Sequence, residues 1–399
     1  MKTPSKADRC YFFKTIFLPL MIMLGLGGIS AVLFQAASQF FLKDIDANRS
    51  TEYLNETLFS VALAFFLTLR PLRAWFSTLL TLFILGQVAF YLSVNWETSR
   101  TTIAPYLALL LKPSLLFIVM WGFANQITTV SEGMKYYIPL TFFSSLIVAP
   151  FTFFSFTKTA ECARVALIGS MIALALTWIG FRWLSAKLPA ERWLDEKSDI
   201  EPTAPSYIFR FAYGFGAFAL MRALLDPLFR ASGDVDPLTI AVGILLLSVG
   251  CYFFGQWLLK QTGWFLSVLT PSLIATITIA IFYVFYVAKV WVSAWVTLNE
   301  IVLRTLPMML LYPLLQIGYL SLLKKDRFQT KAWAEIVFAP IVISSAAFIL
   351  PFILSKFESA ERALTYVVPL AIGVAVAMSP ILAPLGKRKG LLPQPKAKM

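Results

Sequence analysis

Long apolar blocks alternate with short polar segments along almost the whole chain, and these blocks decide the fold class. Most are about 18 residues or longer, the length that an α-helix needs to cross a bilayer. A transmembrane β-barrel would show short segments of alternating polarity, which this sequence lacks. The pattern predicts an all-α polytopic membrane protein with twelve transmembrane helices, at about 12–42, 53–69, 71–94, 102–130, 136–156, 163–183, 207–229, 237–258, 263–287, 290–323, 332–354 and 363–385.

The longest polar segment, 185–206, divides the twelve predicted helices into two halves of six. This arrangement predicts a major-facilitator-like architecture, in which the substrate binds between the halves near the bilayer midplane. We therefore expect an N-terminal half at 1–184, a C-terminal half at 207–386 and a basic tail at 387–399, with 185–206 as a cytoplasmic linker. Pro307 and Pro313 predict a kink in the tenth helix.

The distribution of positive charge predicts the orientation in the membrane. If both termini are cytoplasmic, the cytoplasmic segments hold more than twice as many Lys and Arg residues as the outside segments. That bias is typical of multi-pass proteins with this orientation. The net charge of +13 therefore reflects membrane topology, and we expect lipids as partners and no nucleic acid.

Composition excludes several kinds of chemistry. Only 14% of the residues are charged and 59% are hydrophobic, with a mean hydropathy of +0.76. The chain has no histidine, and its three cysteines are far apart. A His/Cys metal site, a Cys-His nucleophile and a disulfide framework are therefore not expected. The sequence also shows no phosphate-binding P-loop and no GxSxG motif, so we expect neither an enzyme nor a cofactor.

Charged residues inside the predicted helices are the candidate functional residues, because a charge at the centre of a membrane helix costs about 2.5–3.5 kcal/mol. Arg222 and Asp226 lie four residues apart on one helix face, and Glu300 and Arg304 repeat this spacing. Each pair has two possible roles. It either locks its helix into the bundle, or belongs to a polar site where the arginine binds an anion and the acid gates or relays charge.

Three further cations and one acid lie nearer the ends of predicted helices. Lys112 and Arg210 have a second explanation, because long side chains near a membrane surface can extend to the headgroups, and Lys135 has one as a charge that sets the membrane topology. Glu132 is not needed to orient its helix, so we interpret it as a coupling or gating acid.

The stretch WGFANQITTVSEGMKYY at 121–137 resembles the fourth-helix signature of the ATP/ADP translocase family, the non-mitochondrial ADP,ATP carriers. The matching residues are Trp121, Gly122, Phe123, Ala124, Asn125, Gln126, Ile127, Thr128, Glu132, Lys135 and Tyr136. Two weaker matches lie at 223–230 and 299–337. In the first, Asp226 falls on a functional glutamate of the family and Arg230 on its lysine.

The resemblance implies a nucleotide transporter, although the chain departs from the family at several charged positions. Tyr312, Leu315 and Gln316 stand at or beside positions where the family has charged residues, and the family's basic first-helix motif is the neutral stretch 32–42. A nucleoside triphosphate at midplane needs several cations or helix N-termini. We therefore expect a less charged substrate, such as a nucleoside monophosphate, a nucleoside or another small organic anion.

Together these observations predict a secondary transporter that moves a nucleotide or nucleotide-like organic anion by alternating access, through exchange or symport. The alternative is a transport-inactive paralogue with a structural or assembly role. Asn125 and Gln126 either contact the substrate or join neighbouring helices. The predicted substrate-binding residues are Arg222, Arg304, Asn125 and Lys112, and the predicted coupling or gating residues are Glu132, Asp226 and Glu300.

The expected location is the cytoplasmic membrane of a bacterium, with both termini cytoplasmic. The family resemblance implies intracellular bacteria or plastid envelopes, and the N-terminal segment is not rich in Ser and Arg as a transit peptide would be. The sequence is compatible with a monomer.

Overall fold

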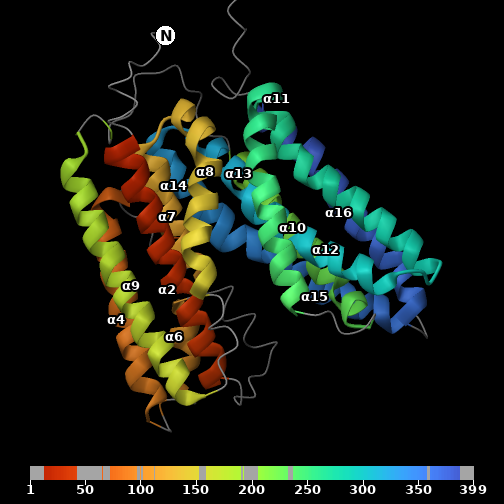
Figure 1. Ribbon diagram of the computed structural model, residues 1–399, viewed down its shortest axis with the longest axis horizontal. Coiled ribbons are helices and arrows are strands. Elements are labelled where there is room, and N and C mark those ends of the chain that lie inside the picture. Colours follow the sequence, from red (N-terminus) through yellow and green to blue (C-terminus); the bar gives the residue numbers. More distant parts are fainter. Residues whose placement is uncertain are drawn as a thin grey trace, which may run out of the picture. The chain divides into compact units, whose positions relative to one another are not determined.

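The computed structural model describes residues 13–42, 65, 72–96, 99, 102–111, 113–151, 159–189, 192, 205–231, 237–356 and 360–386. Within these residues it contains helices and no strand (Figure 1). The chain divides by its contacts into two compact units. Unit 1 comprises Met1–Thr128, Leu140–Lys197 and Arg327–Ala332, and unit 2 comprises Thr129–Pro139, Ser198–Asp326 and Trp333–Met399.

Each unit includes one short segment from the other half of the chain: Thr129–Pro139 belongs to unit 2, and Arg327–Ala332 belongs to unit 1. The chain leaves unit 1 after Thr128 and returns at Leu140, and it leaves unit 2 after Asp326 and returns at Trp333. The main division falls between Lys197 and Ser198, within the polar segment 185–206 that we interpret as the linker.

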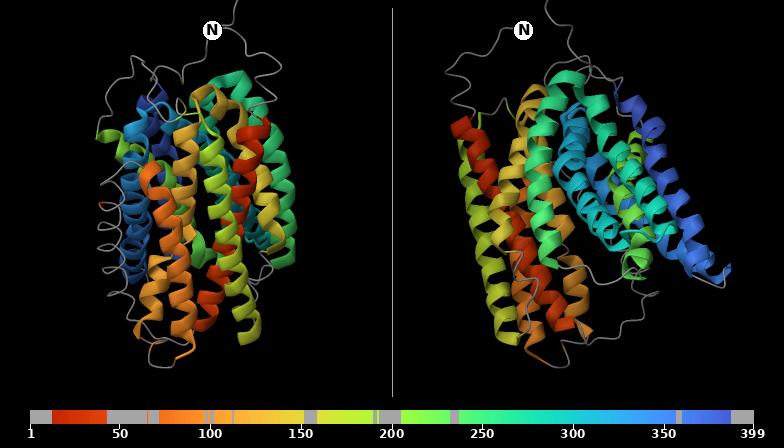
Figure 2. Two further views of the ribbon diagram at one scale, coloured as in Figure 1. Left: turned by 90° about the vertical axis from the view of Figure 1, so that its left-hand side faces the viewer. Right: turned by 45° about the vertical axis from the view of Figure 1, so that its right-hand side comes forward.

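Unit 1 is built from the helices of the first half of the chain. They are α2 (Leu18–Leu42, preceded by the π-helical turn η1, Phe13–Phe17), α4 (Leu72–Val94), α6 (Ala104–Leu110), α7 (Pro113–Ile127), the second half of α8 (Val130–Val148) and α9 (Ala160–Lys187), together with Arg327–Ala332 of a later helix. Helix α9 lies alongside both α2 and α4 (Figures 1 and 2).

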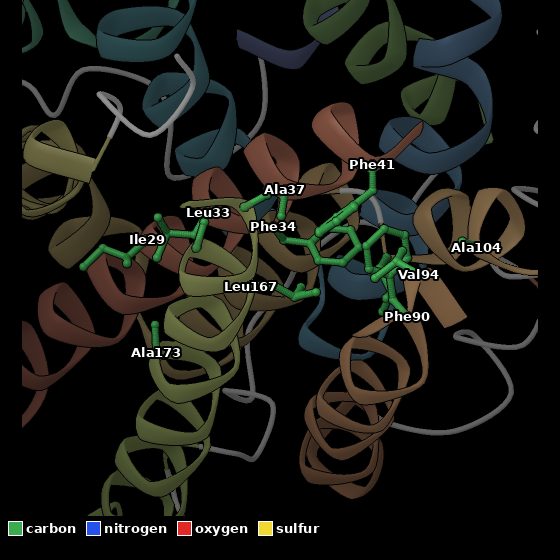
Figure 3. Close-up of a cluster of buried hydrophobic side chains, with 13 residues drawn as sticks. Ile29, Leu33, Phe34, Ala37, Phe41, Phe90, Val94, Ala104, Leu167 and Ala173 are labelled. Atoms are coloured by element: carbon green, nitrogen blue, oxygen red, sulfur yellow. The ribbon is translucent and has the colours of Figure 1, made fainter. Parts of the chain in front are cut away.

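The apolar core of unit 1 lies where α2, α4 and α9 meet. Phe34 of α2 and Phe90 of α4 form an edge-to-face pair with ring centroids 5.1 Å apart (Figure 3). Leu33 of α2 and Leu167 of α9 belong to the same buried cluster. Apolar side chains of three helices therefore pack together, a contact that the apolar blocks of the sequence do not specify.

A buried polar network connects the same three helices. The Ser170 hydroxyl of α9 lies 2.8 Å from the carbonyl of Ser30 in α2 and 3.1 Å from Oε1 of Gln87 in α4. Gln87 Nε2 donates to the Ser30 hydroxyl at 3.2 Å. Hydrogen bonds between small polar side chains are a common means of holding membrane helices together, so we assign this network to helix association.

Unit 2 contains the first half of α8 and the remaining helices. They are α10 (Ser206–Ala231), α11 (Pro237–Val287), α12 (Val292–Leu306), the π-helical turn η4 (Pro307–Leu311), α13 (Tyr312–Leu320), the first residues of α14 (Lys324–Ala332), the π-helical turn η5 (Trp333–Phe338), α15 (Ala339–Lys356) and α16 (Ala360–Gly386). Helix α10 packs against α15 and α16, and α11 packs against α12 and α16.

Helix α11 covers two predicted membrane helices, 237–258 and 263–287, and its backbone breaks between them at Gly263. This residue has φ 74° and ψ −177°, a conformation that is essentially restricted to glycine. The indole N–H of Trp264 next to it donates to the carbonyl of Leu314 in α13 at 2.6 Å, and the Ser267 hydroxyl donates to the Gly263 carbonyl at 2.6 Å. These bonds hold the break in place.

Among the described residues, seven helical segments are long and apolar enough to cross a membrane. They are Phe13–Leu42, Trp75–Val94, Ala160–Lys187, Ser206–Leu225, Thr239–Val287, Val292–Leu320 and Tyr366–Gly386. Shorter helices overlap three other predicted positions. Helices α6 and α7 together lie within 102–130, α8 overlaps 136–156, and α15 overlaps 332–354. The second predicted helix, 53–69, lies outside the described residues apart from Phe65. The all-α polytopic fold class is confirmed, and the irregular turn η4 begins at Pro307, where a kink is predicted.

Candidate functional site

Two arginines share one glutamate inside unit 2. The Arg304 Nε–H donates to Oε2 of Glu300 at 2.5 Å, and the Arg222 Nε lies 3.8 Å from the same oxygen. The Glu300 side chain is buried, with 8% of its surface exposed, whereas 41% of each arginine side chain is exposed. We call these three residues the arginine cluster. It carries one net positive charge.

Two helices position the arginine cluster. Glu300 and Arg304 lie one turn apart on α12, as the four-residue spacing predicts. Arg222 approaches from α10, so the arginine contacts an acid on another helix. The predicted partner, Asp226, also lies in α10, but its side chain is outside the described residues.

Glu300 and Arg304 of the arginine cluster lie near the middle of their apolar segment, Val292–Leu320. Arg304 is twelve residues after Val292 and sixteen before Leu320. At about 1.5 Å per helical residue, it lies roughly 18 Å from one end and roughly 24 Å from the other. The hydrocarbon core is about 30 Å thick, so the Arg304 guanidinium cannot readily reach a headgroup. Membrane charges at this depth usually face the interior of a bundle or water.

A second polar cluster surrounds Glu335 in η5. The amide of Gln316 donates from Nε2 to Oε1 of Glu335 at 3.2 Å. The phenols of Tyr312 and Tyr319 lie against the same carboxylate. We call these four residues the Glu335 cluster. Glu335 lies within the predicted helix 332–354, so its charge inside an apolar block is the sequence signal that marks it.

Aromatic contacts connect α10 to α13, the helix that carries Tyr312 and Tyr319 of the Glu335 cluster. Phe211 stacks on Tyr319 with ring centroids 4.0 Å apart, and Phe215 meets Tyr312 edge-on at 5.3 Å. Further along α10, Arg222 reaches Glu300. The order of these contacts shows that α10 runs antiparallel to α12 and α13, and that both clusters lie along this one helix pair.

Glu132 forms hydrogen bonds with Thr129 at the beginning of α8. The backbone N–H of Thr129 donates to Oε2 of Glu132 at 2.9 Å, and the N–H of Glu132 donates to the Thr129 hydroxyl at 3.4 Å. This reciprocal pair is a capping box, which satisfies backbone donors at a helix start. The contact gives Glu132 a structural role in this conformation, while its predicted gating role stays a prediction.

Asn125 lies at the C-terminal end of α7, where two arginines bind backbone carbonyls. Nη1 of Arg327 donates to the carbonyl of Asn125 at 2.7 Å and to that of Thr128 at 3.2 Å. Nη1 of Arg192 donates to the carbonyl of Ile127 at 3.4 Å. Asn125 is 1% exposed, so a direct substrate contact through its side chain would require movement.

The remaining predicted cations are placed differently. Lys112 lies outside the described residues. Arg210 donates from Nη1 to the carbonyl of Ile381 near the end of α16 at 2.8 Å, and Tyr213 one turn later donates to the carbonyl of Val374 at 2.8 Å. Arg210 therefore binds helix α16, whereas its position near a helix end predicts a side chain extended toward the headgroups. Cations are favourable near helix C-termini.

Comparisons with known proteins bear on the fold. No family model matches the sequence, and no curated protein matches it. The chain is similar to a solved bacterial homologue of the iron transporter ferroportin in its outward-facing state with soaked iron, with a TM-score of 0.68 and 11% identity, over 94% of this chain and 100% of that one. It is also similar to FucP, a Major Facilitator Superfamily transporter in the outward conformation, with a TM-score of 0.62 and 13% identity over 91% and 97%.

A human protein shares the same architecture. The organic anion transporter MFSD10 (TETRAN) aligns with a TM-score of 0.56 and 12% identity, over 93% of this chain and 98% of that one. These similarities establish the major-facilitator-like fold of an integral membrane protein. The resemblance of 121–137 to ATP/ADP translocases stays a prediction.

Proposed function

We propose that the protein is a secondary transporter of a small organic anion, working by alternating access, with Arg222 and Arg304 as the anion-binding residues. The arginine cluster carries this proposal, because Arg304 lies near the middle of a membrane helix, Arg222 of α10 approaches the same glutamate, and both arginine side chains are partly exposed. The major-facilitator-like fold supports the proposal, since the compared structures of this fold are named as transporters or as a homologue of one.

The charge of the arginine cluster favours a monovalent or divalent anion. Arg222 and Arg304 share the single charge of Glu300, which leaves one net positive charge for a ligand. Arginine offers several N–H donors in a fixed plane and binds carboxylates and phosphates in pairs of hydrogen bonds. A nucleoside monophosphate or another small organic anion suits this site better than a triphosphate. The resemblance of 121–137 to nucleotide carriers favours the nucleotide.

Glu300 holds the two guanidiniums in position before an anion arrives. Its buried carboxylate accepts from Arg304 and attracts Arg222 from the other helix. An anion bound between the arginines would compete with Glu300 for the same donors. Such competition would couple substrate binding to the contact between α10 and α12. Asp226 and Glu132 remain the other proposed coupling residues.

Uptake into proteoliposomes tests the proposed function. The panel contains ATP, ADP, AMP, nucleosides, NAD and phosphate, with the wild type beside an Arg222→Ala/Arg304→Ala double variant. We expect uptake of at least one anion, reduced at least 100-fold in the double variant, because two charge-assisted contacts are removed. Arg164→Ala, at an exposed arginine of α9, is the matched control and should keep wild-type uptake.

Two other outcomes would change the conclusion. Equal uptake by the wild type and the double variant would remove the arginine cluster from the anion site. No uptake from correctly folded protein would favour a non-nucleotide substrate or the transport-inactive paralogue. We further propose that the protein works as a monomer in a bacterial cytoplasmic membrane with both termini inside.

A further inference from the structure

The Glu335 cluster has the groups of a recognition site, and the proposed function leaves it unused. Glu335 is partly exposed, and Gln316 orients its carboxylate through the contact at 3.2 Å. Tyr312 lies beside it and is itself partly exposed. A carboxylate can accept about four hydrogen bonds. A ligand with N–H donors can therefore bind next to these protein donors.

The aromatic side chains beside Glu335 favour a flat ring in the ligand. Phe215 of α10 meets Tyr312 edge-on at 5.3 Å, and both side chains are partly exposed. Aromatic rings bind flat ligands by stacking or edge-on contact. Stacking of a nucleobase on an aromatic side chain contributes about 1–3 kcal/mol in known complexes.

The separation of the two clusters sets the length of the ligand. Phe215 precedes Arg222 by seven residues on α10, and Tyr312 follows Arg304 by eight residues on the antiparallel helix. Both spacings correspond to about 10–12 Å along a helix. The pair of helices therefore presents cations at one point, and at another Gln316 of α13 orients the carboxylate of Glu335 from η5. Such a surface fits an anion whose far end carries N–H donors.

The chemistry of a carboxylate selects among nitrogen-containing rings. A carboxylate accepts hydrogen bonds and repels other acceptors. The 2-amino-4-oxopyrimidine edge of guanine or a pterin presents two adjacent N–H donors, which can pair with both oxygens of a carboxylate. Adenine and cytosine present an amino group next to an acceptor, and uracil has one N–H between two carbonyls. The carboxylate of Glu335 therefore fits the first edge best.

We propose that Glu335, with Tyr312 and Phe215, forms a second subsite that binds a ring with a 2-amino-4-oxopyrimidine edge. The anionic end of the same substrate then lies at Arg222 and Arg304. The separation of about 10–12 Å between the arginine cluster and the rings of Phe215 and Tyr312 favours a guanine nucleoside monophosphate over a short pterin carboxylate. This inference rests on the proposed function, because it assigns the other end of the same substrate.

Equilibrium binding to the purified full-length protein in detergent tests the subsite. The ligands are guanosine, inosine, adenosine and uridine 5′-monophosphates, pterin-6-carboxylate and ribose 5-phosphate. Inosine monophosphate lacks only the 2-amino group, and we expect it to bind roughly ten-fold more weakly than the guanosine compound. Uridine monophosphate should bind at least ten-fold more weakly than guanosine monophosphate. Tight binding of pterin-6-carboxylate together with weak binding of guanosine monophosphate would overturn the nucleotide assignment.

Two variants test which residues set the preference. Glu335→Gln replaces one acceptor by a donor, so the preference for guanosine over adenosine monophosphate should fall at least ten-fold, while binding of ribose 5-phosphate stays unchanged. Tyr312→Phe keeps the ring and removes the hydroxyl beside Glu335, so it should lower the same preference several-fold. Tyr213→Phe is the matched control, since Tyr213 donates to α16 at Val374.

The outcomes separate failure of this inference from failure of the proposed function. If all the monophosphates bind equally to the wild type, or if Tyr312→Phe and Glu335→Gln weaken every ligand equally, the ring subsite is wrong and the anion site stands. If no ligand binds the wild type, or if the Arg222→Ala/Arg304→Ala variant binds ribose 5-phosphate normally, the proposed function fails. Should Glu335→Gln fail to fold, the wild-type ligand series and Tyr312→Phe decide.

Discussion

Arg222, Glu300 and Arg304 show how one acid can set the properties of a membrane site. The buried carboxylate reduces the repulsion between two guanidiniums that would otherwise lie close together. A buried charge needs such compensation, because it loses its hydration, and a nearby opposite charge attracts it more strongly in a low dielectric. The glutamate therefore stabilises the protein and limits the charge that is available to a ligand.

Glu300→Gln tests both effects at once. Loss of the carboxylate raises the net charge of the arginine cluster by one, so we expect anion binding to tighten several-fold. The same change leaves two guanidiniums unneutralised, and the free energy of unfolding should fall by about 1–3 kcal/mol, because their partial exposure screens the repulsion. Anion titration and thermal unfolding in detergent measure the two effects. Glu161→Gln, at an exposed acid of α9, should change neither.

Gly263 is the residue whose backbone most constrains the sequence. Its φ of 74° with ψ of −177° is open to glycine and unfavourable for residues with a Cβ. We expect Gly263→Ala to lower the free energy of unfolding by about 1–3 kcal/mol. Gly250→Ala on the same helix is the control, because a Cβ at Gly250 meets no atom within 4 Å. Equal melting temperatures of the two variants would contradict this account.

At the scale of the element, polar contacts in unit 1 join helices whose surfaces are otherwise apolar. The Ser30, Gln87 and Ser170 network connects α2, α4 and α9 at fully buried positions. Apolar packing has little directional preference in a bilayer, where lipid tails are as apolar as the side chains. The network therefore selects one arrangement of the three helices.

Ser170→Ala should loosen this arrangement. The substitution leaves groups of Ser30 and Gln87 without a partner, and we expect about 1 kcal/mol of lost stability, as is usual for hydrogen bonds between membrane helices. Thermal unfolding in detergent measures the change. Ser38→Ala is the matched control, because the Ser38 hydroxyl donates to the Gln35 carbonyl within α2. A larger loss in the control than in Ser170→Ala would contradict the assignment.

Arg327 stabilises the C-terminal end of α7 from a position far along the chain. The guanidinium binds the carbonyls of Asn125 and Thr128, and the residue is 6% exposed. Hydrogen bonds from charged groups contribute about 1.5–3 kcal/mol, and the negative end of the helix dipole adds to the attraction. We expect Arg327→Ala to speed hydrogen exchange at the end of α7 and Arg164→Ala to leave it unchanged.

At the scale of the whole molecule, orientation is the property that the distribution of Lys and Arg predicts. Cys162 is exposed at the start of α9, a position predicted to lie outside, whereas Cys251 is buried in α11. A membrane-impermeant maleimide should therefore label Cys162 on intact cells, and Cys162→Ser should abolish the labelling. Labelling of Cys162 only after the cells are opened would reverse the predicted orientation.

The sequence by itself determined the fold class and the identity of most candidate residues. Apolar blocks of membrane length require helices, because an unpaired backbone group in lipid costs several kcal/mol. Charges within those blocks are rare enough to make Arg222, Glu300 and Arg304 candidate site residues, and the four-residue spacing correctly pairs Glu300 with Arg304. These inferences use short distances along the chain, where helix geometry is regular.

Only the tertiary structure decided which residues from different helices meet. Arg222 is near Glu300, Arg327 binds the end of α7, and Tyr312 and Gln316 meet Glu335. Helical spacing relates residues three or four positions apart, and it contains no information about the face that a distant helix will approach. Contacts between helices depend instead on packing, close approach at small residues and hydrogen bonds made only on assembly.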